Sequence, residues 1–85
     1  MSRAPKILDA ARRDPAGVEF NDLRYLVEAA GWVLKRISGD HHVFSRPRTP
    51  EIINLQPEKR DKKRAKRYQV LQVLDLIEKY GITVN

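Results

Sequence analysis

Two adjacent histidines, His41 and His42, are the side chains in this sequence best suited to moving protons at neutral pH. An imidazole has an ordinary pKa of about 6.5, so it can accept and donate a proton under physiological conditions. Acid–base cleavage of RNA needs little else, because the substrate brings its own 2′-hydroxyl nucleophile and the protein supplies proton transfer and positive charge. The alternative is that both histidines are only polar residues next to a turn.

Other catalytic chemistries find little support in the composition. The chain has no cysteine, which excludes disulfides, thiolate metal sites and cysteine nucleophiles. Its four glycines are dispersed singly, so the sequence has no glycine-rich phosphate loop. Asp40, His41 and His42 are consecutive in a predicted turn and strand, which splays their side chains apart. We therefore expect neither a metal site nor a cofactor.

Positive charge is concentrated in one segment. The formal net charge is +6, and residues 58–67 contribute +5 of it through seven basic and two acidic side chains. Such a segment attracts a phosphate backbone, whereas the alternative is a solvated loop that keeps the protein soluble. The candidate phosphate-binding residues are Lys59, Arg60, Lys62, Lys63 and Arg64, with a second set, Lys35, Arg36, Arg46 and Arg48, on or beside the predicted strands.

Apolar residues at helical spacing predict three helices that could support these residues. Residues 5–13 form a short helix that Asp14-Pro15-Ala16-Gly17 breaks. Residues 21–30 form a second helix with Asn21 as its N-cap. Residues 65–80 form the longest helix, with one apolar stripe and a glycine at its end.

β-Branched and aromatic residues between turn signals predict three strands, at residues 32–38, 41–46 and 51–56, with Gly39-Asp40 and residues 47–50 as the turns. Three short antiparallel strands need support, so helices must cover one face of the sheet and leave the other open. Because side chains alternate along a strand, His42 shares the covered face with Phe44, and His41 points outward. The predicted fold class is α+β, in the order α-α-β-β-β-α.

The aromatic residues could pack in the core or stack on nucleic-acid bases. For Trp32 and Phe44 we favour the core, because each lies next to a predicted element that must be covered. Tyr68 and Tyr80 lie on the last helix, and we interpret both as packing residues.

At 85 residues the chain is expected to form one domain, with an N-terminal helix and link (1–17), a core (18–80) and a short C-terminal tail (81–85). The sequence has no apolar run of the roughly 18 residues that a membrane span requires. Its first residues also lack the apolar stretch of a signal peptide. We therefore expect a cytoplasmic protein with negatively charged partners and no membrane contact.

Several short motifs together resemble one protein family. The first three motifs, in chain order, are Gly31-Trp32, Arg36-Ile37-Ser38-Gly39 and Asp40-His41-His42-Val43-Phe44. Two later motifs follow them, Ile53-Asn54-Leu55-Gln56-Pro57 and Ala65-Lys66-Arg67-Tyr68-Gln69-Val70. This order is similar to that of the HicA (YcfA-like) bacterial toxins, whose signature is Gly-Ser-His-His followed by a hydrophobic residue and an aromatic. The resemblance covers about residues 18–80 and is to a longer branch of the family that has an extra N-terminal helix.

The resemblance implies a fold like the double-stranded RNA-binding domain and a metal-independent endoribonuclease toxin that cleaves mRNA and inhibits translation. It implies that His41 is the catalytic residue, presented by a supporting turn of Gly39, Asp40 and His42, and that a cognate HicB-like antitoxin covers the catalytic face. The chain departs from the family at Asp40, where the family generally has serine. A carboxylate there could raise the pKa of His41 or could repel phosphate.

Two other functions remain compatible with the residues. The first is a non-catalytic RNA-binding module with the same fold and charge. The second is a protein-interaction domain whose open sheet face docks an acidic partner.

Overall fold

Three α-helices and one antiparallel sheet make up residues 3–85, the part of the chain that this computed structural model describes. The order of the elements confirms the predicted α+β class and the order α-α-β-β-β-α. In chain order they are α1 (Arg3–Arg13), a 3₁₀ turn η1 (Pro15–Gly17), α2 (Phe20–Ala29), β1 (Val33–Ser38), β2 (His41–Arg46), β3 (Thr49–Leu55) and α3 (Arg67–Lys79).

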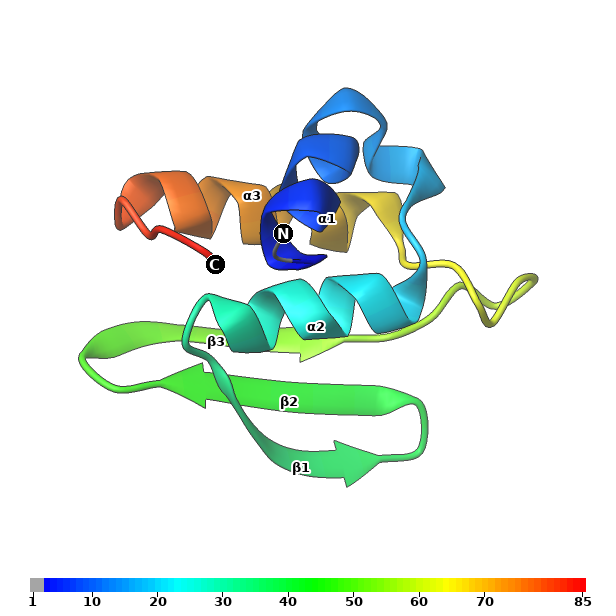
Figure 1. Ribbon diagram of the computed structural model, residues 1–85. Helices are drawn as coiled ribbons and strands as arrows, with labels where there is room; N and C mark the ends of the chain where they lie inside the picture. Colours follow the sequence, from blue (N-terminus) through cyan, green and yellow to red (C-terminus); the bar gives the residue numbers. More distant parts are fainter. Residues whose placement is uncertain (1–2) are drawn as a thin grey trace.

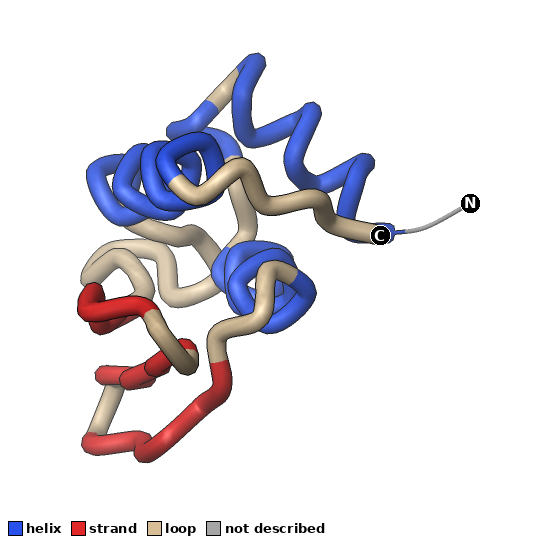
Figure 2. The backbone as a smooth tube through the Cα atoms, turned by 90° about the vertical axis from the view of Figure 1, so that its left-hand side faces the viewer, coloured by secondary structure: helices blue, strands red, loops and turns tan. Residues whose placement is uncertain are grey.

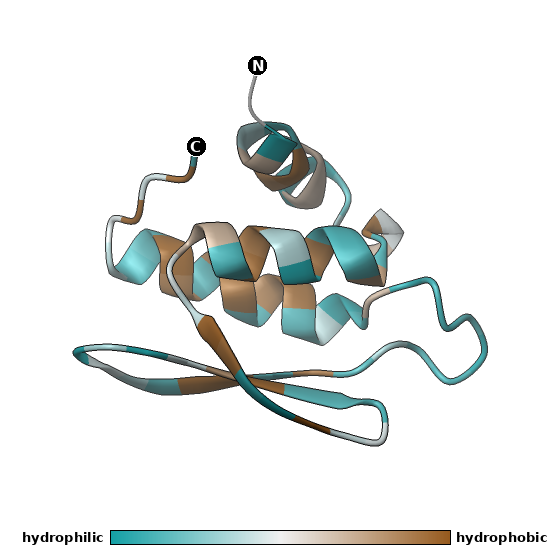
Figure 3. Ribbon diagram, turned by 60° about the horizontal axis from the view of Figure 1, so that its bottom comes forward, coloured by the Kyte–Doolittle hydropathy of each residue, from teal (hydrophilic) through white to brown (hydrophobic). Residues whose placement is uncertain are grey.

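The elements stack in layers, with the sheet on one side of the molecule (Figure 1, Figure 2). The strand order is β1-β2-β3, and all neighbours are antiparallel. The helices lie on one side of the sheet, and α1 packs on α2 and α3 at the greatest distance from the strands (Figure 3). Ala4, Ile7 and Ala11 form the buried face of α1, so this helix is an integral layer of the domain.

The core lies between the sheet and the helices. Trp32 and Phe44 are almost completely buried there, together with Leu23 and Leu26 of α2 and Ile53 of β3. Burying each of these large apolar side chains contributes about 1.5–3 kcal/mol to stability. The prediction that Trp32 and Phe44 are core residues is therefore confirmed.

The register of the sheet confirms the predicted direction of the two histidines. Phe44 pairs with the buried Ile53, so this face of β2 points to the helices. His42 shares that face and is half-buried, whereas His41 is exposed. The open face of the sheet therefore presents His41.

The start of α2 differs from the prediction. The helix begins at Phe20 rather than after Asn21, and the residue before it, Glu19, makes no side-chain cap. The amide of Phe20 instead donates to the backbone oxygen of Lys63 at 2.7 Å. The first residue of α2 is therefore bonded to a loop that is distant in the sequence, a contact that a local N-cap pattern does not indicate.

The turn between β2 and β3 is also shorter than predicted. It consists of Pro47 and Arg48, and Arg48 adopts a left-handed φ of 63°. Arg46 pairs directly with Thr49, so β3 starts two residues before the predicted Glu51. Pro50 is tolerated because β3 is an edge strand and needs no ladder bond from that nitrogen.

Helix α3 runs antiparallel along β3 and is bonded to it at both ends. Near its start, the Gln69 side-chain oxygen accepts a 2.9 Å hydrogen bond from the Gln56 amide. Near its end, Glu51 accepts bonds from Lys79 at 2.6 Å and from the Tyr80 hydroxyl at 2.5 Å. These bonds hold the first turn of α3 beside the end of β3 that faces His41.

The C-terminal tail packs on the core through Val84, which is buried. No helix within residues 3–85 has both the length and the apolar character needed to cross a membrane.

Candidate functional site

His41 is the first residue of β2 and follows a tight turn. Gly39 has a φ of +58°, a left-handed conformation that glycine adopts without strain, and a side chain there would meet open space. The turn therefore presents the exposed imidazole of His41 at the edge of the open sheet face.

The orientation of His41 is set by Asn54 on the neighbouring strand. Its Nδ1 lies 3.2 Å from the amide oxygen of Asn54. An amide oxygen only accepts hydrogen bonds, so the tautomer with the proton on Nδ1 satisfies this contact and has its lone pair on Nε2. Asn54 was not among the predicted site residues. The strand register would have indicated it, because it pairs Asn54 with Val43 on the outward face of β2.

His42 has a different environment. Its Nδ1 lies 3.1 Å from the backbone oxygen of Asp40, and its ring packs edge-on against Phe20 with the centroids 5.1 Å apart. These contacts hold His42 between the turn and the start of α2, on the covered side of the sheet.

Asp40 is paired with a lysine of the basic loop, which we define as residues 58–66. The Lys62 ammonium group lies 2.7 Å from the Asp40 carboxylate. The hydrogen bond and positive charge of Lys62 hold the pKa of Asp40 below its usual value, and His41 and His42 lower it further. The carboxylate is therefore charged, Lys62 offsets its repulsion of phosphate, and the exposed pair lies beside the His41 turn.

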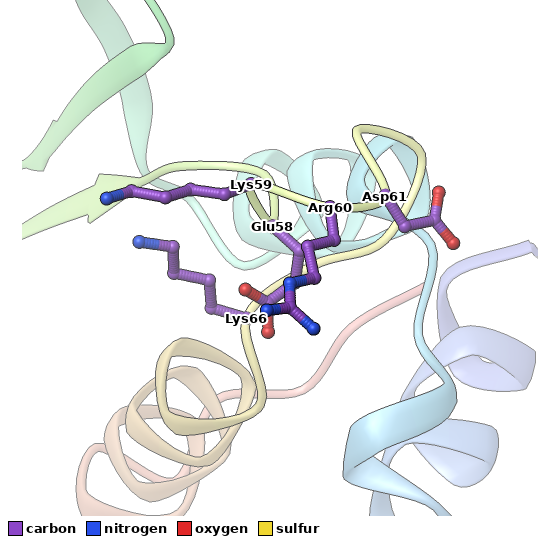
Figure 4. Close-up of a pocket in the computed structure, with 5 residues that line it drawn as sticks. All are labelled: Glu58, Lys59, Arg60, Asp61 and Lys66. Atoms are coloured by element: carbon purple, nitrogen blue, oxygen red, sulfur yellow. The ribbon is translucent and has the colours of Figure 1, made fainter.

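A cluster of cations lies near the end of β3. Lys59, Arg60 and Lys66 line one hollow of about 390 Å³, which Glu58 and Asp61 also line. In Figure 4 the side chains of Lys59 and Lys66 extend in the same direction, away from Asp61. Lys66 was not among the predicted phosphate-binding residues, because only the path of the loop brings it next to Lys59.

The rest of the basic loop faces the start of α2. Lys63 is exposed, and Arg64 donates to the backbone oxygen of Ala16 at 3.0 Å and lies 3.6 Å from the Asp61 carboxylate. The loop is hydrophilic except for the buried Ala65 (Figure 3), and these bonds attach it to the domain. Lys63 and Arg64 therefore extend the positive surface away from His41.

The second set of predicted cations is divided by the structure. Lys35 and Arg36 are exposed on β1. Arg48 lies in the β2–β3 turn, at the other end of β2 from His41. The six residues of β2 span about 17 Å from His41 to Arg46. Arg36 alone of these three pairs with a residue on the outward face, Val43.

Arg46, one of the predicted RNA-binding residues, makes its hydrogen bonds within the domain. Its guanidinium group donates to the backbone oxygen of Ala30 at 3.1 Å and to the Thr49 hydroxyl at 3.0 Å. It also lies over the Trp32 ring, 5.3 Å from the centroid. Arg46 is therefore half-buried and committed to joining the end of α2 to the sheet.

A second hollow, which we call the His41 hollow, lies between the outward face of β3 and the first turns of α3. It has a volume of about 230 Å³ and is lined by His41, Ile52, Asn54, Gln56, Tyr68, Gln69 and Gln72. Tyr68 is 63% exposed, so its interpretation as a packing residue is wrong. Tyr80 is half-buried and bonded to Glu51, so for this residue the packing role holds.

Residues 3–85 contain no group of three or more His, Asp or Glu side chains arranged to hold a metal ion. Asp40, His41 and His42 instead have three different partners, namely Lys62, Asn54 and the Phe20 ring.

Comparison with known proteins gives one match. The family described as HicA toxin of bacterial toxin-antitoxin matches residues 20–82, from the start of α2 to just beyond the end of α3. No curated protein and no solved structure matches the chain. The match leaves out α1 and η1 and includes the His41 turn, the whole sheet and α3. Because it spans most of the sequence and all of the elements around His41, the chain belongs to the HicA toxin family of bacterial toxin-antitoxin systems.

Proposed function

We propose that the protein is a metal-independent endoribonuclease that cleaves mRNA and so inhibits translation, with His41 as its catalytic acid/base. The observation that carries this proposal is the geometry of His41. Its ring is exposed on the open sheet face, its Nδ1 contacts Asn54, and the basic loop lies beside it, with Lys62 against Asp40. The family supplies the setting of a toxin with a cognate antitoxin.

The proposed reaction is transesterification within the RNA strand. Nε2 of His41 takes the proton of a 2′-hydroxyl, and the 2′-oxygen forms a bond to the adjacent phosphorus. The bond from phosphorus to the 5′-oxygen breaks, and that oxygen takes the proton from the His41 imidazolium; where water protonates the oxygen instead, the imidazolium releases its own proton to water. The products are a 2′,3′-cyclic phosphate and a 5′-hydroxyl, and the imidazole returns to its starting state.

Positive charge stabilises the phosphate while negative charge builds on its oxygens. Lys62 lies next to the His41 turn, and Lys59 and Lys66 line the hollow at the end of β3. Both groups lie on the side of the molecule where β1 joins β2, so an RNA backbone can contact them while it crosses His41. Arg60, Lys63 and Arg64 extend this surface along the loop.

The proposed partner in the cell is an acidic, HicB-like antitoxin that covers the outward face of the sheet. Val33 and Ile52 are large apolar side chains exposed by more than half. They lie on strands at the two edges of the sheet, with the His41 turn at one end. A protein that buries them would also block access to His41.

The test compares His41→Gln with its matched control, His42→Gln. With purified protein and a defined mRNA, His41→Gln should lower the cleavage rate by about 10²- to 10⁴-fold, the usual contribution of general acid–base catalysis. His42→Gln removes the second imidazole and should lower stability more than rate, because His42 packs on Phe20. Cleavage by the wild-type protein should persist in EDTA.

Cleavage by His41→Gln at the wild-type rate would show that the catalytic assignment is wrong. If the wild-type protein bound RNA in a salt-dependent manner but never cleaved it, the protein would be a non-catalytic RNA-binding module. Expression of both variants in a bacterial host, with growth and mRNA integrity followed, extends the test to the toxin function.

A further inference from the structure

The His41 hollow has the chemical character of a site for a single flat polar ring. Its lining combines one exposed aromatic ring, one aliphatic side chain and four amide side chains, and His41 is its only titratable nitrogen base. Its volume of about 230 Å³ is below the roughly 300–1,000 Å³ of sites that hold drug-sized ligands. The size and the neutral, hydrogen-bonding lining fit one nucleobase better than they fit a larger molecule.

Tyr68 is held in place but its ring is free for contact. Its hydroxyl accepts a 3.3 Å hydrogen bond from Nε2 of Gln69, a residue that is 5% exposed. The Gln69 oxygen in turn accepts the Gln56 amide at 2.9 Å. A buried amide therefore anchors the polar end of Tyr68 and leaves most of the ring at the surface, whereas core packing would cover the ring instead.

Gln72 lies one helical turn after Tyr68, so the two side chains share a face of α3. An amide presents a donor and an acceptor side by side, as the hydrogen-bonding edge of a base does. Asn54 offers a second amide from β3, on the side of the hollow where it contacts His41. The hollow thus has a stacking surface with polar groups at its margin.

The position of the nearest cation agrees with this interpretation. Lys66 donates a 3.1 Å hydrogen bond to the Gln56 side-chain oxygen, which places its ammonium group between the His41 hollow and the hollow that contains Lys59. A nucleotide with its base in the His41 hollow would therefore have its phosphate near Lys66. The same nucleotide would lie against His41.

We propose that the His41 hollow binds one unpaired base of single-stranded RNA, with Tyr68 stacking on the base and Gln72 bonding to its edge. The subsite selects the nucleotide next to the bond that is cut. This inference rests on the proposed ribonuclease function for its biological meaning, but base binding is measured separately from cleavage. Duplex RNA would not use the subsite, because its bases are already paired and stacked.

The test uses the His41→Gln variant, so that the RNA stays intact, and measures binding by fluorescence anisotropy. The probes are a single-stranded oligoribonucleotide and an RNA duplex. Adding Tyr68→Ala should weaken binding of the single strand between about 5-fold and 150-fold, the range measured when a stacking aromatic is removed. Tyr68→Phe should keep the affinity, and duplex binding should change by less than about 2-fold.

The matched control is Tyr25→Ala. Tyr25 is also a partly exposed helical tyrosine, but it lies on α2 beneath Arg3 and outside both hollows. Its removal should leave RNA binding unchanged. Gln72→Ala should change the order in which oligo-A, oligo-C and oligo-U bind, and in the His41-containing protein it should change the preferred cleavage sites.

The inference is overturned if Tyr68→Ala binds the single strand as tightly as the parent variant, or if it weakens duplex binding equally. It is also overturned if Gln72→Ala alters neither the order of binding nor the cleavage sites. These results would leave the ribonuclease proposal intact when cleavage still requires His41. Conversely, Tyr68-dependent binding without any cleavage by the wild-type protein would support the base subsite and reject the ribonuclease.

Discussion

Each end of β2 has a basic side chain beside it, and the two side chains differ in the groups that they contact. At one end, Lys62 contacts Asp40 beside His41. At the other end, Arg46 contacts Ala30 and Thr49 beside Trp32. Both ends therefore combine a cation with an aromatic or imidazole ring and a tight turn.

The difference lies in what each cation is bonded to. Arg46 donates to a backbone oxygen at the end of α2 and is half-buried, so releasing it would leave a polar group without its charged partner. Lys62 and Asp40 are both more than half exposed, with side-chain exposures of 59% and 51%. Water can replace either partner of such a pair at little cost, and a phosphate can replace the Asp40 carboxylate as the partner of Lys62. We infer that one end of β2 maintains the fold and that the other is available to a ligand.

The largest effect in this comparison is expected for Arg46→Gln. Loss of its two hydrogen bonds should lower the free energy of unfolding by about 1.5–3 kcal/mol, the usual contribution of bonds from charged donors. Lys62→Gln should lower it by less than about 1 kcal/mol, because exposed ion pairs contribute little. Urea denaturation measures both values.

For RNA affinity we expect the opposite order, with a larger effect for Lys62→Gln than for Arg46→Gln. In the His41→Gln background, Lys62→Gln should weaken RNA binding and reduce the slope of log affinity against log salt by about 1. Folded Arg46→Gln should keep the slope of its parent. If Arg46→Gln lost as much RNA affinity as Lys62→Gln without loss of stability, the two ends would not differ in the way that we infer.

A smaller effect is expected at the two glycines beside these ends. Gly31 has a φ of +103°, and a side-chain carbon there would lie 2.9 Å from Nε of Arg46. Gly39 has a φ of +58° with open space around it. Gly31→Ala should therefore cost about 1–2 kcal/mol through strain and displacement of Arg46, whereas Gly39→Ala should cost less, about 1 kcal/mol, through its backbone conformation alone.

Thermal or urea denaturation of the two variants checks this prediction. Gly39→Asn serves as the control, because asparagine tolerates the left-handed region better than alanine does. Equal losses at the two glycines would mean that the contact with Arg46 adds nothing to the cost at Gly31.

The smallest effect concerns the two carboxylates, Glu51 and Asp40. Hydrogen bonds from Lys79 and Tyr80 lower the pKa of Glu51 from 4.5 to about 2. Because the folded-state pKa lies below the unfolded one, this stabilisation is fully present above about pH 4.5 and is lost as pH falls towards 2. Glu51→Gln should therefore reduce the loss of stability across that range.

Asp40→Asn is the matched comparison. The pKa of Asp40 is lowered by Lys62 in the same direction, but the Asp40 side chain is 51% exposed and that of Glu51 is 26% exposed. Solvent screens the more exposed pair more strongly, so Asp40→Asn should change acid stability less. Denaturation midpoints at several pH values between 2 and 6 measure both effects. A larger change in acid stability for Asp40→Asn than for Glu51→Gln would contradict the inference that Glu51, through Lys79 and Tyr80, contributes more to the stability of the fold.

Local pattern was enough to predict some features of the fold. The alternation of side chains placed His42 and Phe44 on the covered face and His41 outside, and the register confirms it. Local pattern did not give the start of α2, which lies one residue before Asn21, at Phe20, whose amide donates to Lys63 far along the chain. An N-cap pattern describes only neighbouring residues and carries no information about such a partner.

The candidate site shows the same division. His41 stands out by residue type and by family resemblance, and the lysines of the basic loop stand out by charge. Asn54, Lys66 and Tyr68 do not, because an amide, one lysine among many and a helical tyrosine are common on any surface. Only the pairing of β3 with β2 and the course of α3 along β3 bring them beside His41.

The sequence by itself determined the order of the elements, the outward direction of His41, the family and the concentration of positive charge. These features depend on periodicity, residue type and short motifs, which are local properties of the chain. Tertiary structure decided which cations are available to a ligand. Arg46 donates a hydrogen bond to the Ala30 backbone oxygen, whereas Lys62 contacts only an exposed carboxylate, that of Asp40. It also decided that Tyr68 lies at the surface beside His41. The reason is that hydrogen bonds and burial depend on partners distant in the chain, and those partners are brought together only when the sheet and helices pack.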